Sequence, residues 1–288
     1  MPAASANGIT IEYETFGDPA DPAVLLIMGF NGQLTLWDEP FCAALAARGH
    51  YVIRYDNRDV GLSTWFDDAG EPGLLDLLSG TVAAPYSVVD MAADGVGLLD
   101  ALGIPSAHVV GVSMGGMIAQ TFALDHPDRL RTLTSIMSTT GDPTVGQPSP
   151  DALAALVPVP PASREEAVEL GVVMWRTIGS PGFPFDEAAV RERAGAAYDR
   201  AFHPSGASRQ LAAVVTQPDR TPALGSVTAP TLVVHGADDP LIHVSGGEAT
   251  AAAIPAARLV VVPGMGHDMP EELTERFVDE LVGHFAQA

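Results

Sequence analysis

The segment from Gly111 to Gly115 reads Gly-Val-Ser-Met-Gly, with a serine between two glycines. A hydrophobic run leads directly into Ser113 and a helix-forming run follows it, so the chain must turn sharply at the serine. Such a strand-to-helix turn strains the serine backbone and lifts its hydroxyl above the sheet, where it can act as a nucleophile. The turn also points a helix N-terminus at the hydroxyl, which favours a developing negative charge. A serine that only caps the helix is the alternative interpretation.

A serine hydroxyl becomes a good nucleophile only when a base takes its proton, and His267 is the first candidate for that base. His267 follows the last predicted strand in the run Val-Pro-Gly-Met-Gly-His. This position places it at the same edge of the sheet as Ser113. His243 lies on another loop that opens at this edge and is the main rival. The other histidines lie at predicted strand or helix ends or between residues 141 and 221, and we interpret them as structural.

The base needs a carboxylate that fixes its tautomer and stabilises the imidazolium. Asp238 and Asp239 both follow the penultimate predicted strand. We assign Asp239, because the turn that begins at Gly236 brings it over the sheet and leaves Asp238 in solvent. Asp142, beyond the preceding strand, is the alternative acid. The order serine, aspartate, histidine along the chain matches one of the known arrangements of this triad.

Acyl transfer also needs N–H donors for the oxyanion of the transition state. One donor is expected from the backbone of Met114, at the start of the helix after Ser113. The other is expected from the loop Met28–Gly32, which follows the first parallel strand. Within this loop we assign the backbone N–H of Phe30. The two glycines of the loop are equally compatible with an ordinary turn.

Short aliphatic and β-branched runs alternate with longer helical stretches along most of the chain. Their nearly continuous hydrophobicity is typical of parallel strands covered on both faces. The predicted strands are Ala23–Met28, Tyr51–Tyr55, His108–Val112, Thr132–Met137, Thr231–Val234 and Leu259–Val262, and the predicted helices are Pro40–Arg48, Val89–Leu102, Met114–Leu124 and Glu271–Phe285. Ile9–Phe16 instead alternates apolar and polar residues, which predicts an antiparallel edge strand. The pattern predicts an α/β fold with a mostly parallel, doubly wound sheet.

Residues 141–221 depart from this alternation of predicted strands and helices. They are rich in proline and alanine and contain helical stretches at Glu165–Ile178 and Phe185–Ala201. We therefore predict a mainly helical cap inserted late in the sheet. Open α/β sheets bind ligands at the carboxyl edge of their strands, so the cap is expected over that edge. The predicted domains are a core of residues 1–140 and 222–288 and a cap of residues 141–221.

The composition is that of an ordinary globular protein. The chain has 288 residues and one cysteine, Cys42, so no disulfide can form within it. Its formal net charge of −22 argues against nucleic acid as a partner, because a polyanion would be repelled. The start of the chain lacks a secretory signal and no apolar run approaches the ~20 residues that cross a bilayer, so we expect a cytoplasmic location and no membrane partner. No metal-ligand spacing or nucleotide-binding loop stands out, and we predict neither metal nor cofactor.

Together these motifs resemble the α/β-hydrolase superfamily over nearly the whole chain outside the predicted cap. The segment Tyr55–Ser63 also resembles the Asp-x-Arg-x-x-Gly-x-Ser motif of that family, in which Asp56 and Arg58 usually have structural roles. Within the superfamily the chain looks most similar to the aclacinomycin methylesterase group. The segments that carry this resemblance are Gly17–Pro22, the Met28-Gly29 loop, Arg54–Asp56, His108–Gly111 and Pro263–His267.

Enzymes of the aclacinomycin methylesterase group remove the methyl group from a carboxymethyl ester on an aromatic polyketide glycoside. The resemblance implies that Ser113, Asp239 and His267 form a catalytic triad. It also implies that the backbone N–H groups of Phe30 and Met114 bind the oxyanion.

We therefore expect a carboxylic ester hydrolase that works through an acyl-enzyme on a small-molecule ester with a bulky apolar or aromatic group, such as a methyl ester. The alternatives are C–C bond hydrolysis, lactone opening or peracid formation at the same triad, and a non-catalytic small-molecule receptor. The protein is expected to be a monomer or a homodimer. The side chains expected to line the substrate pocket, with core or cap packing as their alternative role, are Trp37, Trp65, Met174, Trp175, Phe183 and Phe185.

Overall fold

The computed structural model describes residues 2–73, 76–77, 82–156 and 160–288. The strands in this part of the chain are β1 (Ala3–Ala6), β2 (Ile9–Phe16), β3 (Ala23–Ile27), β4 (Tyr51–Tyr55), β5 (Ala107–Val112), β6 (Leu130–Ile136), β7 (Thr231–Gly236) and β8 (Arg258–Val262). They form one sheet in the order β1-β2-β4-β3-β5-β6-β7-β8, and β3 to β8 all run parallel. The predicted α/β class and mostly parallel, doubly wound sheet are confirmed.

The register of the parallel strands brings the site-bearing loops together. Ile27 at the end of β3 pairs with Gly111, and Val112 at the end of β5 pairs with Ile136. The segments after β3, β5 and β6 therefore leave the sheet side by side at its carboxyl edge. Gly236 at the end of β7 pairs with β8 in the same way, so the loops after β7 and β8 also open at this edge.

The edge of the sheet differs from the prediction. The strand Ile9–Phe16 is antiparallel to β4, as expected, but β1 pairs along its outer side. The expectation that Ile9–Phe16 forms the edge is therefore wrong. Asn7 and Gly8 make the turn between β1 and β2 with φ of 48° and 79°, the signs that a tight two-residue hairpin requires.

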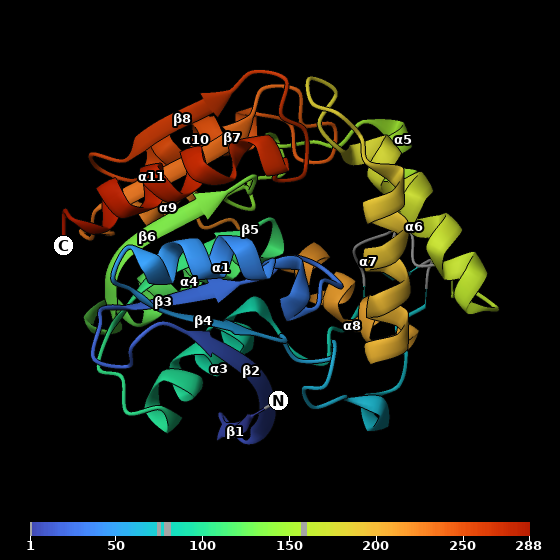
Figure 1. Cartoon of the computed structure of the whole chain (residues 1–288), viewed down its shortest axis with the longest axis horizontal. Helices are drawn as coiled ribbons and strands as arrows, with labels where there is room; N and C mark the ends of the chain where they lie inside the picture. The colour runs from blue at the N-terminus through green and yellow to red at the C-terminus, as the bar shows by residue number, and fades with distance from the viewer. Residues whose placement is uncertain (1, 74–75, 78–81, 157–159) are drawn as a thin grey trace.

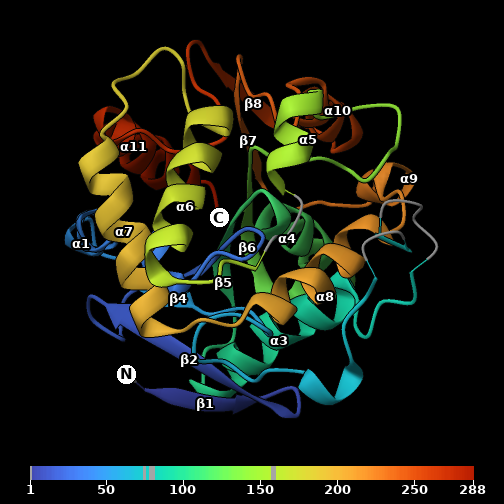
Figure 2. The same cartoon turned by 90° about the vertical axis from the view of Figure 1, so that its right-hand side faces the viewer.

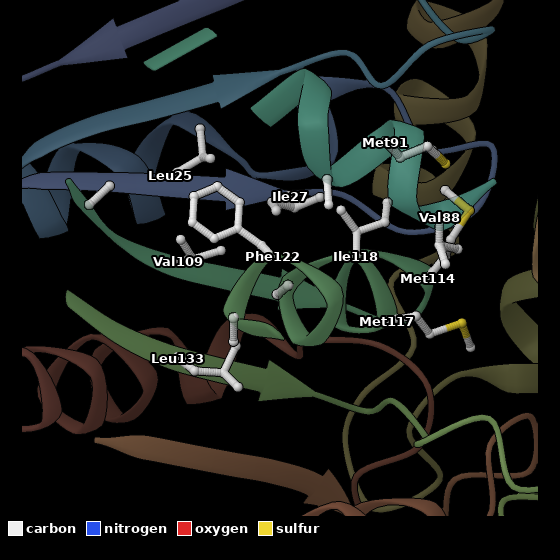
Figure 3. Packing of buried hydrophobic residues seen from close by; sticks show 14 of the residues in the cluster. Leu25, Ile27, Val88, Met91, Val109, Met114, Met117, Ile118, Phe122 and Leu133 are labelled. Atoms are coloured by element: carbon white, nitrogen blue, oxygen red, sulfur yellow. The ribbon is translucent and has the colours of Figure 1, made fainter. Parts of the chain in front are cut away.

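Helices cover both faces of the sheet. One face carries α3 (Val88–Ala101), α4 (Met114–Asp125), α9 (Thr221–Leu224) and α10 (Ser245–Ala253), and the other carries α1 (Glu39–Ala47) and α11 (Thr274–Phe285). Short 3-10 turns lie at η1 (Leu34–Leu36), η2 (Asp67–Ala69), η3 (Pro127–Arg129) and η4 (Glu271–Leu273). Figure 3 shows Ile118 and Phe122 of α4 packed towards Ile27 and Val109 of the sheet. This apolar contact fixes the helix that begins directly after Ser113.

In the described part of the chain, four helices follow one another after β6 and precede the short helix α9. They are α5 (Pro150–Leu156), α6 (Arg164–Ile178), α7 (Glu187–Arg200) and α8 (Pro204–Val215). The strand arrows of Figure 1 point towards α6 and α7, and Figure 2 shows all four helices in front of the carboxyl ends of the strands. We call residues 141–221 the helical insertion. Its role as a separate cap stays a prediction.

Three buried histidines gather around Phe285 on the α11 face. The rings of His50 and His108 lie 5.2 Å and 4.4 Å from the Phe285 ring, and His284 precedes it. Burial lowers the pKa of His108 from 6.5 to about 3, and the nearby charge of Arg131 adds to the shift. Burial also lowers the pKa values of the other two histidines. The folded protein therefore keeps these rings neutral at neutral pH.

We expect the free energy of unfolding to fall as the pH drops below about 6.5. The unfolded chain returns the pKa of His108 to about 6.5, so between that pH and about 3 the unfolded state binds a proton that the folded state does not. Each pH unit in this window lowers the contribution of His108 to the free energy of unfolding by about 1.4 kcal/mol. Urea unfolding at pH 7 and pH 5 should show that His108→Gln loses about 2 kcal/mol less than the wild type. Equal losses in the two proteins would contradict this expectation.

Candidate active site

Ser113 forms the tight turn between β5 and α4. Its backbone has φ 55° and ψ −121°, which costs free energy for any residue except glycine. A Cβ at Gly111 would lie 2.0 Å from the Gly115 carbonyl oxygen, and a Cβ at Gly115 would lie 2.1 Å from the Ile27 oxygen. Only glycine therefore fits at either position. The Ser113 N–H donates to the Ile136 carbonyl at 2.9 Å, which ties the strained residue to β6.

The Ser113 hydroxyl begins a chain of hydrogen bonds through two buried side chains. His267 Nε2 lies 2.9 Å from Ser113 Oγ, and His267 Nδ1 lies 2.7 Å from Asp239 Oδ2. Asp239 Oδ1 accepts from the N–H groups of Leu241 and Ile242 at 2.8 and 2.9 Å. Because a carboxylate only accepts, Nδ1 carries the histidine proton and Nε2 is left to accept from the serine. The structure thus brings together the three residues that the sequence singles out.

The rival candidates have their own partners. His243 Nδ1 lies 3.0 Å from a serine hydroxyl on the same loop. Asp142 accepts hydrogen bonds from a threonine two residues along the chain. Asp238 Oδ2 accepts from the Gly264 N–H at 2.8 Å. Among the described residues, none of these three groups joins the hydrogen-bonded chain from the nucleophile.

The loop after β3, residues 28–34, lies against the nucleophile, and we call it the donor loop. A Cβ at Gly29 would lie 3.1 Å from Ser113 Cβ and 3.7 Å from Ser113 Oγ. No hydrogen bond joins the N–H of Phe30, the next residue, to any other residue that the structure describes. Met114 stands first in α4, where helix N–H groups lack an intrahelical acceptor. Both assigned donors are therefore available beside the serine.

The loop that carries the base, residues 263–268, is fastened to the helical insertion, and we call it the base loop. The His267 N–H donates to the Ile178 carbonyl at 2.7 Å. Ser180 Oγ accepts from the Gly266 N–H at 2.8 Å and donates to the Asp268 carboxylate. Burial raises the pKa of Asp268, while the bond from the Ser180 hydroxyl lowers it. The insertion therefore helps to set the position of the base.

Sequence reasoning missed three of the residues that support this site, Ser180, Asp268 and Gln210. The sequence could have pointed to Asp268, because this acidic residue directly follows the candidate base His267. No sequence pattern points to Ser180 or Gln210, since the backbone groups they bind lie 86 and 179 residues away along the chain. Only the folded arrangement shows that they contact the base loop and the donor loop.

Trp37 lies in the hydrophobic core. Its side chain is 2% exposed and stacks on Phe41, with the ring centroids 5.4 Å apart. Both rings belong to the core cluster between the sheet and the helices α1 and α11. Core packing, the alternative role expected for Trp37, accounts for this burial, and its contact with the substrate stays a prediction.

The other side chains expected in the pocket occupy varied surroundings. Trp65 and Phe185 are 41% and 37% exposed and lie against a histidine ring and an arginine guanidinium, respectively. Phe183 is half-buried and packs against the core. Met174 and Trp175 on α6 pack against an apolar cluster that includes the residue whose carbonyl binds the base loop. The contact of all these side chains with a substrate stays a prediction.

The described residues contain no group of three or more histidine, cysteine, aspartate or glutamate side chains placed to hold a metal ion. The same residues include no helix that is long and apolar enough to span a membrane. Cys42 is free and buried, and burial raises the pKa of its thiol to about 12. The thiol therefore stays protonated at neutral pH.

Residues 22–177 match the sequence model of the alpha/beta hydrolase fold. The chain belongs to the α/β-hydrolase family. Residues 207–287 of this hydrolase also match a model described as TAP-like protein. The family resemblance identified in the sequence is thereby confirmed.

Two curated proteins and one solved structure are similar to this hydrolase. The rhodomycin D methylesterase DauP of a Streptomyces species is 33% identical over 298 residues, which cover 96% of this chain and 95% of DauP. The 3-oxoadipate enol-lactonase 2 of Acinetobacter baylyi is 27% identical, over 85% of this chain and 81% of its own length. The crystal structure of the enol-lactonase from Burkholderia xenovorans is 24% identical and matches with a TM-score of 0.76 over 99% of this chain and 100% of that one, which shows the shared fold.

Proposed function

We propose that this hydrolase cleaves a carboxylic ester through an acyl-enzyme on Ser113. One observation carries the proposal, namely the continuous hydrogen-bonded chain from Asp239 through His267 to a strained, half-buried serine. A nucleophile, a base and an orienting carboxylate in this geometry are the parts that acyl transfer requires. A serine that only caps a helix would need neither the strained backbone nor the buried base.

In the proposed mechanism, Ser113 Oγ attacks the ester carbonyl carbon while His267 Nε2 takes the hydroxyl proton. The N–H groups of Phe30 and Met114 hold the negative charge that develops on the carbonyl oxygen. His267 then gives its proton to the leaving alkoxide, which departs as an alcohol and leaves the acyl-enzyme. Water attacks the acyl carbon with His267 as base, the carboxylic acid departs, and the serine regains its proton. Asp239 holds His267 and stabilises the imidazolium in both halves of the reaction.

We propose a methyl ester of a bulky apolar or aromatic acid as the substrate class. The similarity to a rhodomycin D methylesterase over nearly the whole chain supports this choice. Phe30 follows the glycine that lies against the nucleophile and is only half-buried, so it offers an apolar surface for the acyl group. Met174 and Trp175 offer further apolar surface on α6.

Hydrolysis of methyl esters of aromatic acids, beside p-nitrophenyl esters from acetate to decanoate, tests the proposal. We expect methanol and free acid in equal amounts. In ¹⁸O-water each acid molecule should gain one ¹⁸O, because water attacks the acyl-enzyme. A fluorophosphonate should label Ser113 and block turnover, with heat-denatured protein as the unlabelled control. Absence of both turnover and labelling would refute the proposal, whereas labelling without ester turnover would refute the ester substrates and retain the nucleophile.

Lactone opening is the second candidate, and the similarity to an enol-lactonase over 85% of the chain favours it. The same attack by Ser113 opens a cyclic ester, but the alcohol stays attached to the acyl chain and no separate alcohol is released. A lactone panel run beside the methyl esters distinguishes the two reactions. A kcat/KM for lactones far above that of the best methyl ester would favour lactone opening.

A further inference from the structure

The donor loop is held by hydrogen bonds from two sides. The Asn31 N–H donates to Gln210 Oε1 and the Leu34 N–H donates to Asp56 Oδ1, both at 2.8 Å. Asn57 Nδ2 donates at 2.9 Å to the first carbonyl of the loop. Asp56 and Asn57 follow β4 in the core, whereas Gln210 comes from α8 of the helical insertion. A residue of the insertion thus takes part in shaping the oxyanion site.

The Gln210 side chain is fully buried, with 0% exposure, and bridges two backbone groups. Its Oε1 accepts from the Asn31 N–H, and its Nε2 donates to the Arg58 carbonyl at 2.8 Å. A reversed carboxamide would place a donor against a donor and an acceptor against an acceptor. The side chain therefore has one orientation, with its oxygen directed at the donor loop.

The neighbouring Arg209 anchors α8 to the core. Its Nε and Nη2 each donate to the Asp59 carboxylate at 2.8 Å, and both side chains are buried. A two-point contact between a guanidinium and a carboxylate fixes both distance and direction. At the start of the same helix, His203 stacks on Trp65 with the ring centroids 4.0 Å apart. The backbone that carries Gln210 is thus held in place relative to the sheet.

We propose that Gln210 is a positioning residue for the oxyanion hole. Asn31 has φ 54°, a left-handed conformation that is uncommon for a residue other than glycine, and its bond to Gln210 holds it there. The Asn31 N–H belongs to the peptide unit that directly follows Phe30, so fixing this unit restricts rotation about the Phe30 backbone and thereby limits the directions open to the free Phe30 N–H. The inference rests on the proposed acyl-transfer function, since only an oxyanion makes that direction matter.

Loss of this acceptor should lower kcat more than it changes KM, because the oxyanion forms only on the way to the acyl-enzyme. Removal of a direct oxyanion donor costs about 10²–10³ in kcat, so a misdirected donor should cost about 10–100-fold. We expect Gln210→Met to show this fall with KM within about threefold of the wild type. The inhibition constant of a trifluoromethyl ketone, which adds to Ser113 and forms an oxyanion, should rise in parallel, whereas that of the corresponding alcohol should not.

Gln120 offers a matched control. Its side chain is also 0% exposed and bonds to Ser135 and Arg220. Gln120→Met removes the same polar atoms from a site that, among the described residues, forms no hydrogen bond with the donor loop. It should lower stability by a similar amount and leave kcat within about threefold. A fall in kcat that is no larger in Gln210→Met than in Gln120→Met, or a change in KM alone, would overturn the inference.

Hydrogen exchange gives a readout that does not depend on turnover. The Asn31 amide should exchange at least about tenfold faster in Gln210→Met than in the wild type, because it has lost its acceptor. If the methionine variant does not fold, Gln210→Asn, which withdraws the oxygen from Asn31, should show a smaller fall in kcat at unchanged KM, and no fall would overturn the inference. A wild type that hydrolyses no ester would instead refute the proposed function.

Discussion

Replacement of Ser113 by alanine should abolish ester turnover in a protein that stays folded. We expect kcat/KM to fall by about 10⁴–10⁶, because loss of the nucleophile removes the acyl-enzyme route and leaves only the oxyanion donors and substrate binding. The hydrogen bond between His267 and Asp239 does not involve the serine and should persist in the variant. Methanol release from a methyl ester gives the rate, and fluorophosphonate labelling should disappear with it.

The strained backbone of Ser113 gives a second expected result at the same position. Alanine keeps the Cβ at φ 55°, so Ser113→Ala should unfold in urea at nearly the wild-type concentration. Ser113→Gly removes the Cβ and relieves the strain. Glycine also gives the unfolded chain more freedom, so we expect a net gain of about 1 kcal/mol in the free energy of unfolding. The inactive glycine variant would then be more stable than the enzyme.

Ser226→Ala is the matched control for this experiment. The Ser226 hydroxyl donates to a carbonyl three residues earlier in the chain, away from the hydrogen-bonded chain of the site. Its activity should stay within about twofold of the wild type. If Ser113→Ala keeps more than about 1% of the wild-type rate, another group forms the acyl-enzyme and the assignment is wrong.

The sequence was sufficient to predict the parallel strands because most of their side chains are apolar on both faces. Ala23–Ile27 is buried at every position, and such a run has few alternatives to a central strand. The Gly-x-Ser-x-Gly motif was predictable for a different reason. The backbone around positions 111 and 115 leaves no room for a Cβ, so the two glycines in the sequence indicate the sharp turn at Ser113.

The strand β1 could have been predicted and was not. Ala3–Ala6 has no β-branched residue and no clear alternation, so periodicity alone leaves it as a loop. Asn7-Gly8 is the strongest short hairpin signal that a sequence carries, and it directly precedes the predicted strand Ile9–Phe16. The alternation of Ile9–Phe16 alone puts the edge of the sheet at that strand, whereas the Asn7-Gly8 turn indicates one further strand outside it.

The contacts that hold the donor loop and the base loop could not be predicted from the sequence. Gln210 and Ser180 are ordinary polar residues in helical and loop segments, and their burial depends on how the insertion packs on the core. The aromatic residues show the same limit. Trp37 and Trp175 were grouped by residue type, yet one is packed in the core and the other lies on α6 near the base loop.

Asp239→Asn should lower kcat by about 10⁴, and the hydrogen bonds around Asp239 explain why. Asp239 Oδ1 accepts from two backbone N–H groups, those of Leu241 and Ile242. In the variant these donors would hold the asparagine oxygen on their side and turn its NH₂ group towards His267 Nδ1. The histidine would then accept at Nδ1 and carry its proton on Nε2, facing Ser113 with a donor in place of the base.

Asp238→Asn is the control for this prediction, with the same substitution at the adjacent residue. Asp238 accepts from the Gly264 N–H, and an asparagine oxygen can accept that bond equally well. We therefore expect kcat within about threefold of the wild type for Asp238→Asn, and urea unfolding should show that both variants stay folded. Because the altered tautomer deprives Ser113 of its base, the rate of fluorophosphonate labelling should fall with kcat in Asp239→Asn only. A large loss in Asp238→Asn with near-normal activity in Asp239→Asn would assign the orienting carboxylate to Asp238.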